Sequence, residues 1–329
     1  MAYARRRRRR WPALLAVAAL VIVAGAGAEI LRDGSGAGPA RAPAPRAAPG
    51  PLQHSPVAAL AGSGTAPSPL AVRLAGGPDP VHLRFKHPPR SGLLFDVDTG
   101  RVLWRRAPTR VLPIASLTKM MTALVVDDHV PRHARVRITK QALAYQGSGV
   151  GVLPKGKRVK VEPMLYGLLL PSGNDAAIAL AQRASGTVRR FVRAMNARAA
   201  AMGLVCSHFT SPSGFYDAGN HSCAGDLAML ARAILRVPRL AKIVRTRSIV
   251  LPFPIKGHKL YLYNNNPLLR LGYRGTTGVK TGYTDAAGHC LVATARRGDV
   301  DLGVVLLHSP DTGSQAMRLF NRGFRAEGV

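Results

Sequence analysis

The segment Ser116-Leu117-Thr118-Lys119 opens a helical pattern that runs to Asp128, and it is the only Ser-x-x-Lys in the chain. Because positions i and i+3 share one face of a helix, the Lys119 amine can reach the Ser116 hydroxyl. Burial and a neighbouring cation both lower the pKa of a lysine, so a neutral Lys119 could take the serine proton. The helix N-terminus also offers a backbone N–H and positive potential to a developing oxyanion. Taken alone, a helix cap beside a solvated lysine explains so short a pattern better.

Two further segments, each unique in the chain, change that interpretation. Ser172-Gly173-Asn174 precedes a helical pattern, where a hydroxyl and a carboxamide can shuttle a proton and hold a substrate amide; a simple helix cap is compatible with this role. Lys280-Thr281-Gly282 lies on a predicted strand, which suits an extended peptide ending in a carboxylate, with a glycine that permits close backbone approach. A strand-end turn is the alternative. The three segments in this order predict a nucleophilic serine site.

Strand patterns lie at the two ends of the region that starts near Val81, and helical patterns lie between them. One β-hairpin is predicted at residues 92–104, around Asp98-Thr99-Gly100, and another at residues 290–307, around Arg297-Gly298-Asp299. Helices are predicted at residues 116–128, 162–170, 175–183, 187–202, 222–235 and 310–324. This order predicts an α+β fold, in which an antiparallel sheet is flanked by helices and carries a mostly helical subdomain.

The three segments resemble the Ser-x-x-Lys, Ser-x-Asn and Lys-Thr-Gly motifs of the penicillin-recognising serine enzymes. The resemblance is closest to the low-molecular-mass D-alanyl-D-alanine carboxypeptidases and extends from Gly92 to Phe324. It implies a β-lactamase/transpeptidase-like fold that needs no cofactor and no metal. It also implies removal of the terminal D-alanine from peptidoglycan stem peptides through an acyl-enzyme, with β-lactams as covalent inhibitors. A D,D-endopeptidase or a weak β-lactamase on the same fold is the alternative.

The resemblance assigns catalytic roles to the first two motifs. Ser116 is the acyl-accepting nucleophile and Lys119 is its base. Ser172 relays the proton to the leaving D-alanine. Asn174 binds the substrate backbone and helps to fix the Lys119 side chain.

The resemblance assigns substrate binding to the third motif. Lys280 and Thr281 bind the terminal carboxylate of the peptide, and Gly282 allows the strand to approach. The oxyanion hole is formed by the backbone N–H groups of Ser116 and Tyr283.

Class A β-lactamases share these motifs but use a glutamate, acting through a water molecule, for deacylation. This chain has no glutamate between Glu162 and Glu327, and its middle motif is Ser-Gly-Asn rather than Ser-Asp-Asn. We therefore expect a long-lived acyl-enzyme with penicillin and slow release of the hydrolysed drug.

The N-terminus predicts export. Six arginines at residues 5–10 precede an apolar stretch at residues 13–28, which ends in Ala-Gly-Ala. Residues 1–28 therefore have the pattern of a signal peptide, with an uncleaved N-terminal membrane anchor as the alternative. Either way the remainder is expected to be extracytoplasmic, secreted or held to the outer face of the cytoplasmic membrane. Residues 29–80 are rich in Ala, Pro and Gly and predict a disordered tether, which leaves residues 81–329 as the catalytic domain.

Composition and charge bound the remaining classes. The chain is 47% hydrophobic, which excludes full disorder, and no long internal apolar run indicates a polytopic membrane protein. A formal net charge of +31 favours association with anionic cell-wall polymer or a membrane surface, and it leaves a non-catalytic basic binding protein as an alternative. Nucleic acid is not expected, since aromatic residues for base stacking make up only 5%. A binder would have no need of Lys119 beside Ser116.

The three cysteines are too few for a disulfide scaffold of this length. Cys206 and Cys223 flank a Gly/Asn-rich loop, where a disulfide in an oxidising compartment and a pair of buried thiols both remain open. Cys290 lies in a strand pattern and is expected to belong to the core.

Overall fold

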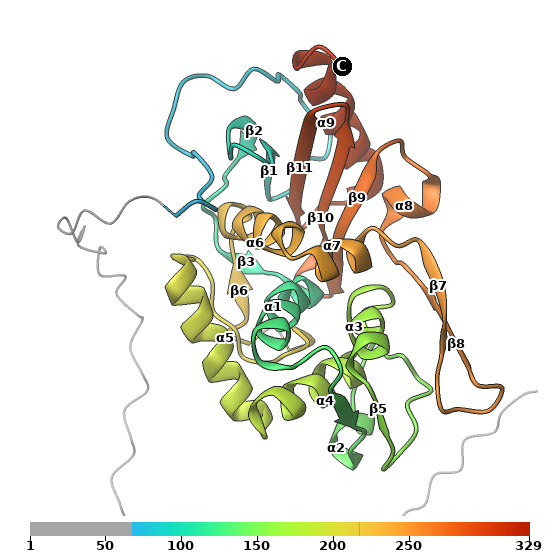
Figure 1. The fold of residues 1–329 in the computed structure, drawn as a ribbon. Coiled ribbons are helices and arrows are strands. Elements are labelled where there is room, and N and C mark those ends of the chain that lie inside the picture. The colour runs from blue at the N-terminus through green and yellow to red at the C-terminus, as the bar shows by residue number, and fades with distance from the viewer. Residues whose placement is uncertain (1–67, 217) are drawn as a thin grey trace, which may run out of the picture. The chain divides into compact units, whose positions relative to one another are not determined.

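The computed structural model describes residues 68–216 and 218–329, all of which lie in one compact unit, Ser63–Val329 (Figure 1). The expected signal peptide or anchor and residues 29–67 of the expected tether lie outside the described residues. Among the described residues, no helix has the length and apolar character needed to cross a bilayer.

A five-stranded antiparallel sheet has the order β2-β1-β11-β10-β9. Its strands are β1 (Ser91–Asp96), β2 (Val102–Arg106), β9 (Thr276–Thr284), β10 (Gly288–Arg297) and β11 (Val300–Leu307). The two predicted hairpins are β1–β2 and β10–β11. Pairing of β1 with β11 joins them into one sheet, so strands from both ends of the domain lie side by side.

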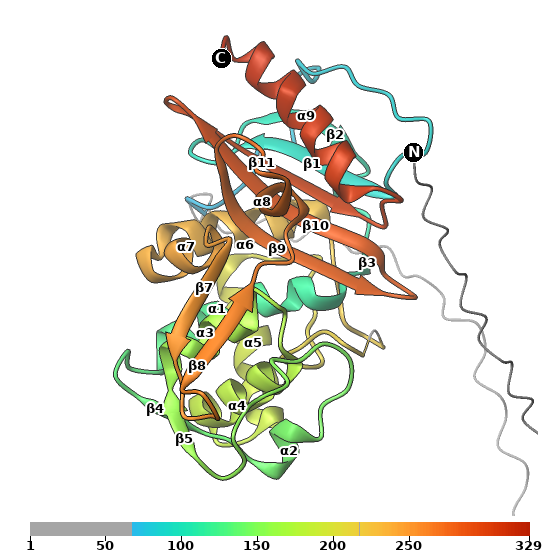
Figure 2. The ribbon, with the colours of Figure 1, turned by 90° about the vertical axis from the view of Figure 1, so that its right-hand side faces the viewer.

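Alternate residues of the strands enter two separate cores, because successive side chains of a strand point to opposite faces. Leu93 and its partner Val305 belong to the core that also contains the central helices. Leu94 and its partner Val304 pack with α9 (Thr312–Ala326) on the other face. Figure 2 shows α9 along one face of the sheet and α6 and α7 on the opposite face. Full burial of each such side chain stabilises the fold by about 1.5–3 kcal/mol.

The helices between the hairpins form the second layer and confirm the predicted α+β architecture. They are α1 (Lys119–His129), α2 (Lys140–Leu143), α3 (Val161–Leu169), α4 (Asn174–Ser185), α5 (Val188–Met202), α6 (Ala224–Arg236), α7 (Pro238–Val244) and α8 (Pro267–Leu271). Helix α1 is enclosed by the others, and residues 120–126 are all buried. This is why its sequence carries no polar face.

Several short elements have no counterpart in the sequence-based prediction. They are the pairs β3 (Leu112–Pro113) with β6 (His221–Ser222), β4 (Arg135–Arg137) with β5 (Arg158–Lys160) and β7 (Ser248–Pro252) with β8 (Lys259–Tyr263), together with α2, α7 and α8. Strands of two or three residues are too short to show a period, and the outer residues of β4 and β5 are charged.

The end of the expected tether lies on the domain. Residues 68–80 are described, and the Arg73 N–H donates a hydrogen bond to the Gly100 carbonyl over 2.9 Å. The buried Arg232 guanidinium donates to the Ala71 carbonyl over 2.6 Å. These contacts satisfy backbone groups that an extended linker would leave to water.

Candidate active site

Ser116 lies in a short 3-10 turn, η1 (Ala115–Thr118), directly before α1. The sequence pattern predicts that the α-helix itself begins at Ser116, whereas the structure begins it at Lys119. The reason lies in Ala115, whose φ of 48° is outside the right-handed helical region and turns the chain sharply into η1. Lys119 remains one turn after Ser116, and its Nζ lies 2.9 Å from the Ser116 Oγ.

The Lys119 amine has three partners and no exposure to solvent. Its Nζ contacts the Ser116 Oγ, the Asn174 Oδ1 at 2.6 Å and the Ser213 carbonyl at 2.8 Å. The amide oxygen and the carbonyl are acceptors only. A neutral amine has two N–H groups and one lone pair, so it donates both hydrogens to these two oxygens. The lone pair is then left facing the Ser116 hydroxyl, which is the arrangement a general base requires.

The electrostatics of the site favour the neutral amine. Burial lowers the pKa of Lys119 well below its usual value, and the nearby charge of Lys280 lowers it further. The buried carboxylate of Asp175 acts in the opposite direction and raises this pKa. Burial is the largest of the three effects, because removing an ammonium group from water without a paired anion penalises its charged form.

Asn174 and Asp175, at the start of α4, hold a loop against the site. The Asn174 Nδ2 donates to the Gln146 carbonyl over 2.5 Å, which fixes its oxygen toward Lys119, and its backbone N–H donates to the Ser148 carbonyl over 2.8 Å. The Asp175 carboxylate accepts the backbone N–H groups of residues 150–151 at 2.9 and 3.0 Å. The loop is therefore tied to α4 at several points.

Ser172 lies in the turn between α3 and α4, with a φ of 69°. The residue is 5% exposed, and its Oγ has no hydrogen-bond partner among the described residues. Ser172 lines the same cavity as Ser116. A buried hydroxyl without a partner costs free energy, so this group is available to a substrate atom.

Strand β9 brings the third motif against the nucleophile. A Cβ at Gly282 would lie 2.9 Å from the Ile114 carbonyl oxygen and 3.2 Å from the Ser116 nitrogen, so only glycine lets the strand approach this closely. The Lys280 Nζ donates to the Thr281 carbonyl over 2.8 Å, and burial lowers the pKa of Lys280 to about 7. Tyr283 follows and is exposed.

The motif residues meet at a cavity of about 330 Å³. It is lined by Ser116, Ser148, Ser172, Asn265, Pro267, Thr281, Gly282, Tyr283, His289, Cys290 and Thr312. Lys119, Asn174 and Lys280 are buried. The structure thus brings together the three motifs that the sequence analysis singled out.

Some residues of the cavity are absent from the sequence-based prediction. Ser148 lies between two glycines, and Asn265 is the middle residue of three consecutive asparagines, both of which are unusual enough to have drawn attention. His289 is the cross-strand partner of Tyr283, and the two rings are tilted by 33° with 4.6 Å between their centroids. Thr312 carries no sequence signal that marks it.

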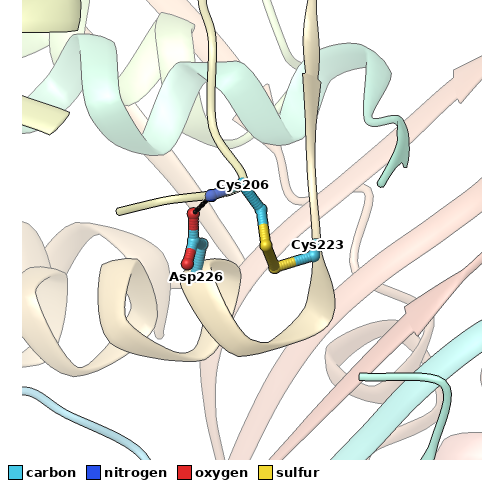
Figure 3. Close-up of side chains that lie close together, drawn as sticks. All are labelled: Cys206, Cys223 and Asp226. Atoms are coloured by element: carbon cyan, nitrogen blue, oxygen red, sulfur yellow. Dashed lines mark hydrogen bonds between the residues drawn. A yellow bond between two sulfur atoms is a disulfide. The ribbon is translucent and has the colours of Figure 1, made fainter. Parts of the chain in front are cut away.

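Cys206 and Cys223 are joined by a disulfide, with 5.5 Å between their Cα atoms (Figure 3). Asp226 lies beside them, and its carboxylate accepts the Cys206 N–H over 2.8 Å and the Ser207 hydroxyl over 2.8 Å. With free thiolates these three side chains could form part of a metal site, but the disulfide engages both sulfurs. We therefore assign the group a structural role.

The loop closed by this disulfide lies against α1. The Thr122 hydroxyl donates to the Pro212 carbonyl over 2.6 Å, and the Asn220 amide donates to the Thr118 hydroxyl over 2.9 Å. The same loop supplies the Ser213 carbonyl to Lys119. The disulfide thus closes a loop that contributes directly to the site.

The fold and this constellation have the geometry that a serine enzyme requires when a lysine activates its nucleophile. A model of the Peptidase_S11 family, D-alanyl-D-alanine carboxypeptidase, matches residues 82–311. The chain belongs to this family, which confirms the resemblance inferred from the motifs.

Known relatives agree with this assignment. The D-alanyl-D-alanine carboxypeptidase DacF of Bacillus subtilis is 35% identical over 219 residues, which are 65% of this chain and 56% of that protein. The D-alanyl-D-alanine endopeptidase of Pseudomonas aeruginosa is 35% identical over 218 residues, 65% of this chain and 70% of that protein. The solved structure of the Streptomyces K15 DD-transpeptidase superposes with a TM-score of 0.69 at 31% identity, covering 74% of this chain and all of that one.

Proposed function

We propose that this protein is a serine-type D-alanyl-D-alanine carboxypeptidase, which removes the terminal D-alanine from peptidoglycan stem peptides. The observation that carries the proposal is the set of three contacts at the Lys119 Nζ, with two acceptors that leave the lone pair for Ser116. Membership of the family supplies the substrate class.

Acylation follows from the geometry. The Ser116 Oγ attacks the carbonyl carbon of the penultimate D-alanine while its proton passes to Lys119. The negative charge that develops on the carbonyl oxygen is stabilised by the backbone N–H groups of Ser116 and Tyr283, across the close approach at Gly282. The C–N bond then breaks, and Ser172 passes its proton to the leaving amine of D-alanine. Ser172 takes the proton held by Lys119 in return, which leaves Lys119 neutral again.

Binding and turnover use the remaining residues. The charged Lys280 and the Thr281 hydroxyl bind the terminal carboxylate of the peptide, and Asn174 binds the peptide backbone. Water then attacks the acyl-enzyme carbonyl and gives up a proton to the neutral Lys119. Lys119 passes this proton to the Ser116 Oγ as the acyl C–O bond breaks, and the shortened peptide is released. A β-lactam acylates Ser116 in the same way, and the lack of a glutamate between residues 163 and 326 favours slow release.

The test is mass spectrometry of a stem pentapeptide incubated with the protein. The expected result is loss of a single alanine, blocked by prior treatment with penicillin. Labelling with a fluorescent penicillin is expected for the wild type and absent for Ser116→Ala. Equal labelling of the two proteins would refute the assignment of the nucleophile.

A second activity is suggested by the endopeptidase among the relatives. Incubation with a crosslinked muropeptide dimer separates the two, since only an endopeptidase yields monomers. We further propose that the enzyme acts outside the cytoplasm, on the evidence of the arginine run and apolar stretch at residues 5–28. Its net charge of +31 supports association with an anionic surface there.

A further inference from the structure

A second and larger cavity, of about 570 Å³, shares no lining residue with the catalytic one. We call it the basic groove. Strands β4 and β5 pair antiparallel and are connected through α2, and we refer to this pair as the β4–β5 hairpin. This pair and the start of α3 form one wall, and the β7–β8 turn forms the other. Figure 2 shows the β7–β8 hairpin running down beside β4 and β5. Arg135, Arg158 and Lys160 bring positive charge to it, while Leu251, Pro252 and Pro254 contribute apolar surface.

The β4–β5 hairpin is built from like charges placed opposite one another. Arg135 pairs with Lys160, and Arg137 pairs with Arg158. All four side chains are exposed, and none of them forms an ion pair among the described residues. Cross-strand pairs change sheet stability by roughly 0.2–1 kcal/mol, and like charges directly opposite are unfavourable. Folding alone therefore gives no reason for this pattern.

The lining of the groove contains one acidic residue, Glu162. Apart from Glu162 and Pro163, the lining comes from residues 129–161 and 227–284, which contain no Asp or Glu. Glu162 shares Arg239 with Asp127, at 2.6 and 3.4 Å, so this cluster has a formal net charge of one negative. The four cations of the hairpin outnumber it, and none of them is paired with a carboxylate in the described structure, so they favour binding of an external anion.

We propose that the basic groove binds a linear phosphodiester polymer of the cell wall. The paired cations repeat at every second residue, about 6.6 Å apart along each strand, which suits a chain with regularly spaced charges. Three of the four are arginines, whose planar fork donates two parallel hydrogen bonds to a phosphate. The apolar surface of Leu251, Pro252 and Pro254 offers contact to the carbon backbone between phosphates.

Strands β4 and β5 by themselves do not suit a bilayer. Their exposed side chains are all charged, so they have no apolar group to insert below the lipid headgroups. The β7–β8 hairpin on the other wall exposes Val250, Tyr261 and Tyr263, so the test below includes anionic vesicles. The proposal rests on the extracytoplasmic location given under Proposed function, but not on the catalytic assignment. Because the two cavities are separate, a bound polymer would retain the enzyme on the wall without competing with the stem peptide.

The test measures binding of the full chain to synthetic poly(glycerol phosphate) as a function of salt. The groove variant carries Arg135→Gln, Arg137→Gln, Arg158→Gln and Lys160→Gln. The matched control carries Arg189→Gln, Arg190→Gln, Arg193→Gln and Arg322→Gln, which are exposed, form no ion pair in the described structure and remove the same charge elsewhere. The groove variant is expected to lose tenfold or more in affinity and to show a weaker salt dependence. The control is expected to lose less than threefold.

Labelling with fluorescent penicillin serves as the control for folding and for the catalytic site, and both variants should label at the wild-type rate. Loss of polymer binding with normal labelling would then concern the groove alone, and not the proposed catalytic function. If the groove variant does not label, the wild type is treated with phenylglyoxal, which modifies arginine, with and without the polymer. The polymer should protect Arg135 and Arg137 from modification, and modification at an unchanged rate would overturn the proposal. Equal loss in groove variant and control would overturn the proposal. Equal affinity for polygalacturonate, or binding to anionic vesicles in place of the polymer, would overturn it as well.

Discussion

Replacing Asp175 with Asn tests the electrostatic balance at Lys119 while keeping the size of the side chain. Asp175 is fully buried and accepts the backbone N–H groups of residues 150–151 at 2.9 and 3.0 Å. Asn retains one acceptor oxygen, so one partly buried N–H would face an amide nitrogen. A fully buried donor without a partner costs about 1–3 kcal/mol, so for a partly buried one we expect the free energy of unfolding to fall by about 1 kcal/mol.

The same substitution removes the charge that raises the pKa of Lys119. Without it the pKa of Lys119 falls further, so the amine is neutral down to a lower pH. The acid limb of the acylation rate, which reports protonation of the base, should therefore move to lower pH. The assay is the second-order rate of labelling by fluorescent penicillin between pH 4 and 9, with urea unfolding measured in parallel.

Asp226→Asn is the matched control, since Asp226 is also a buried carboxylate that accepts a backbone N–H. It should lower stability and leave the acid limb in place. An unchanged acid limb in Asp175→Asn, or a move to higher pH, would refute the electrostatic argument.

Three further outcomes are expected. Burial lowers the pKa of Lys280 to about 7, so the free enzyme loses this cation as the pH rises through 7, and kcat/KM for a peptide should fall on the alkaline side of its pH profile. In Lys280→Arg the fall in kcat/KM should occur at a higher pH, because arginine keeps its charge. If the fall stays at the same pH in this variant, it belongs to another group. Gly282→Ala places a Cβ 2.9 Å from a backbone oxygen, so the acylation rate should fall at least tenfold, and wild-type acylation would contradict the close approach. The double variant Cys206→Ser, Cys223→Ser should lose about 3 kcal/mol of stability by calorimetry, since the loop spans 17 residues, and should acylate more slowly because that loop carries the Ser213 carbonyl. Acylation at the wild-type rate would show that the loop holds its position without the disulfide.

The sequence predicted the parts of the site that depend on side-chain identity. The i, i+3 spacing allowed Lys119 to reach Ser116, and Gly282 was noted as a glycine within the Lys-Thr-Gly motif, but the roles of these residues came from the resemblance of the three motifs to a known family. The Ser213 carbonyl could not be predicted in this way, because a backbone oxygen leaves no trace in residue type. Which residues of the loop before Asn174 reach the cavity also depends on packing between segments far apart in the chain.

The fold was predictable where elements are long and periodic. The hairpins that became β1–β2 and β10–β11 alternate clearly, and α5 has both a Thr187 cap and Gly203 at its end. The short pair β4–β5 was not predictable, because its alternating charged residues resemble a solvated loop. The 3-10 turn at Ser116 depends on the φ of Ala115, which an alanine gives no reason to expect.

Ser116, the proposed nucleophile, and Lys280 with Thr281, the proposed carboxylate-binding residues, lie far apart in the sequence, in η1 and β9. An N-terminal fragment that ends before Thr276 would contain Ser116 and Lys119, yet it would lack β9, the strand that completes the cavity. Strand β9 reaches the rest of the sheet only through β10 and β11, and β11 pairs with β1, so the cavity is complete only when the last strands are in place. On the proposed function we therefore expect a chain that is incompletely synthesised, or cleaved before β9, to be inactive and to remain unlabelled by penicillin.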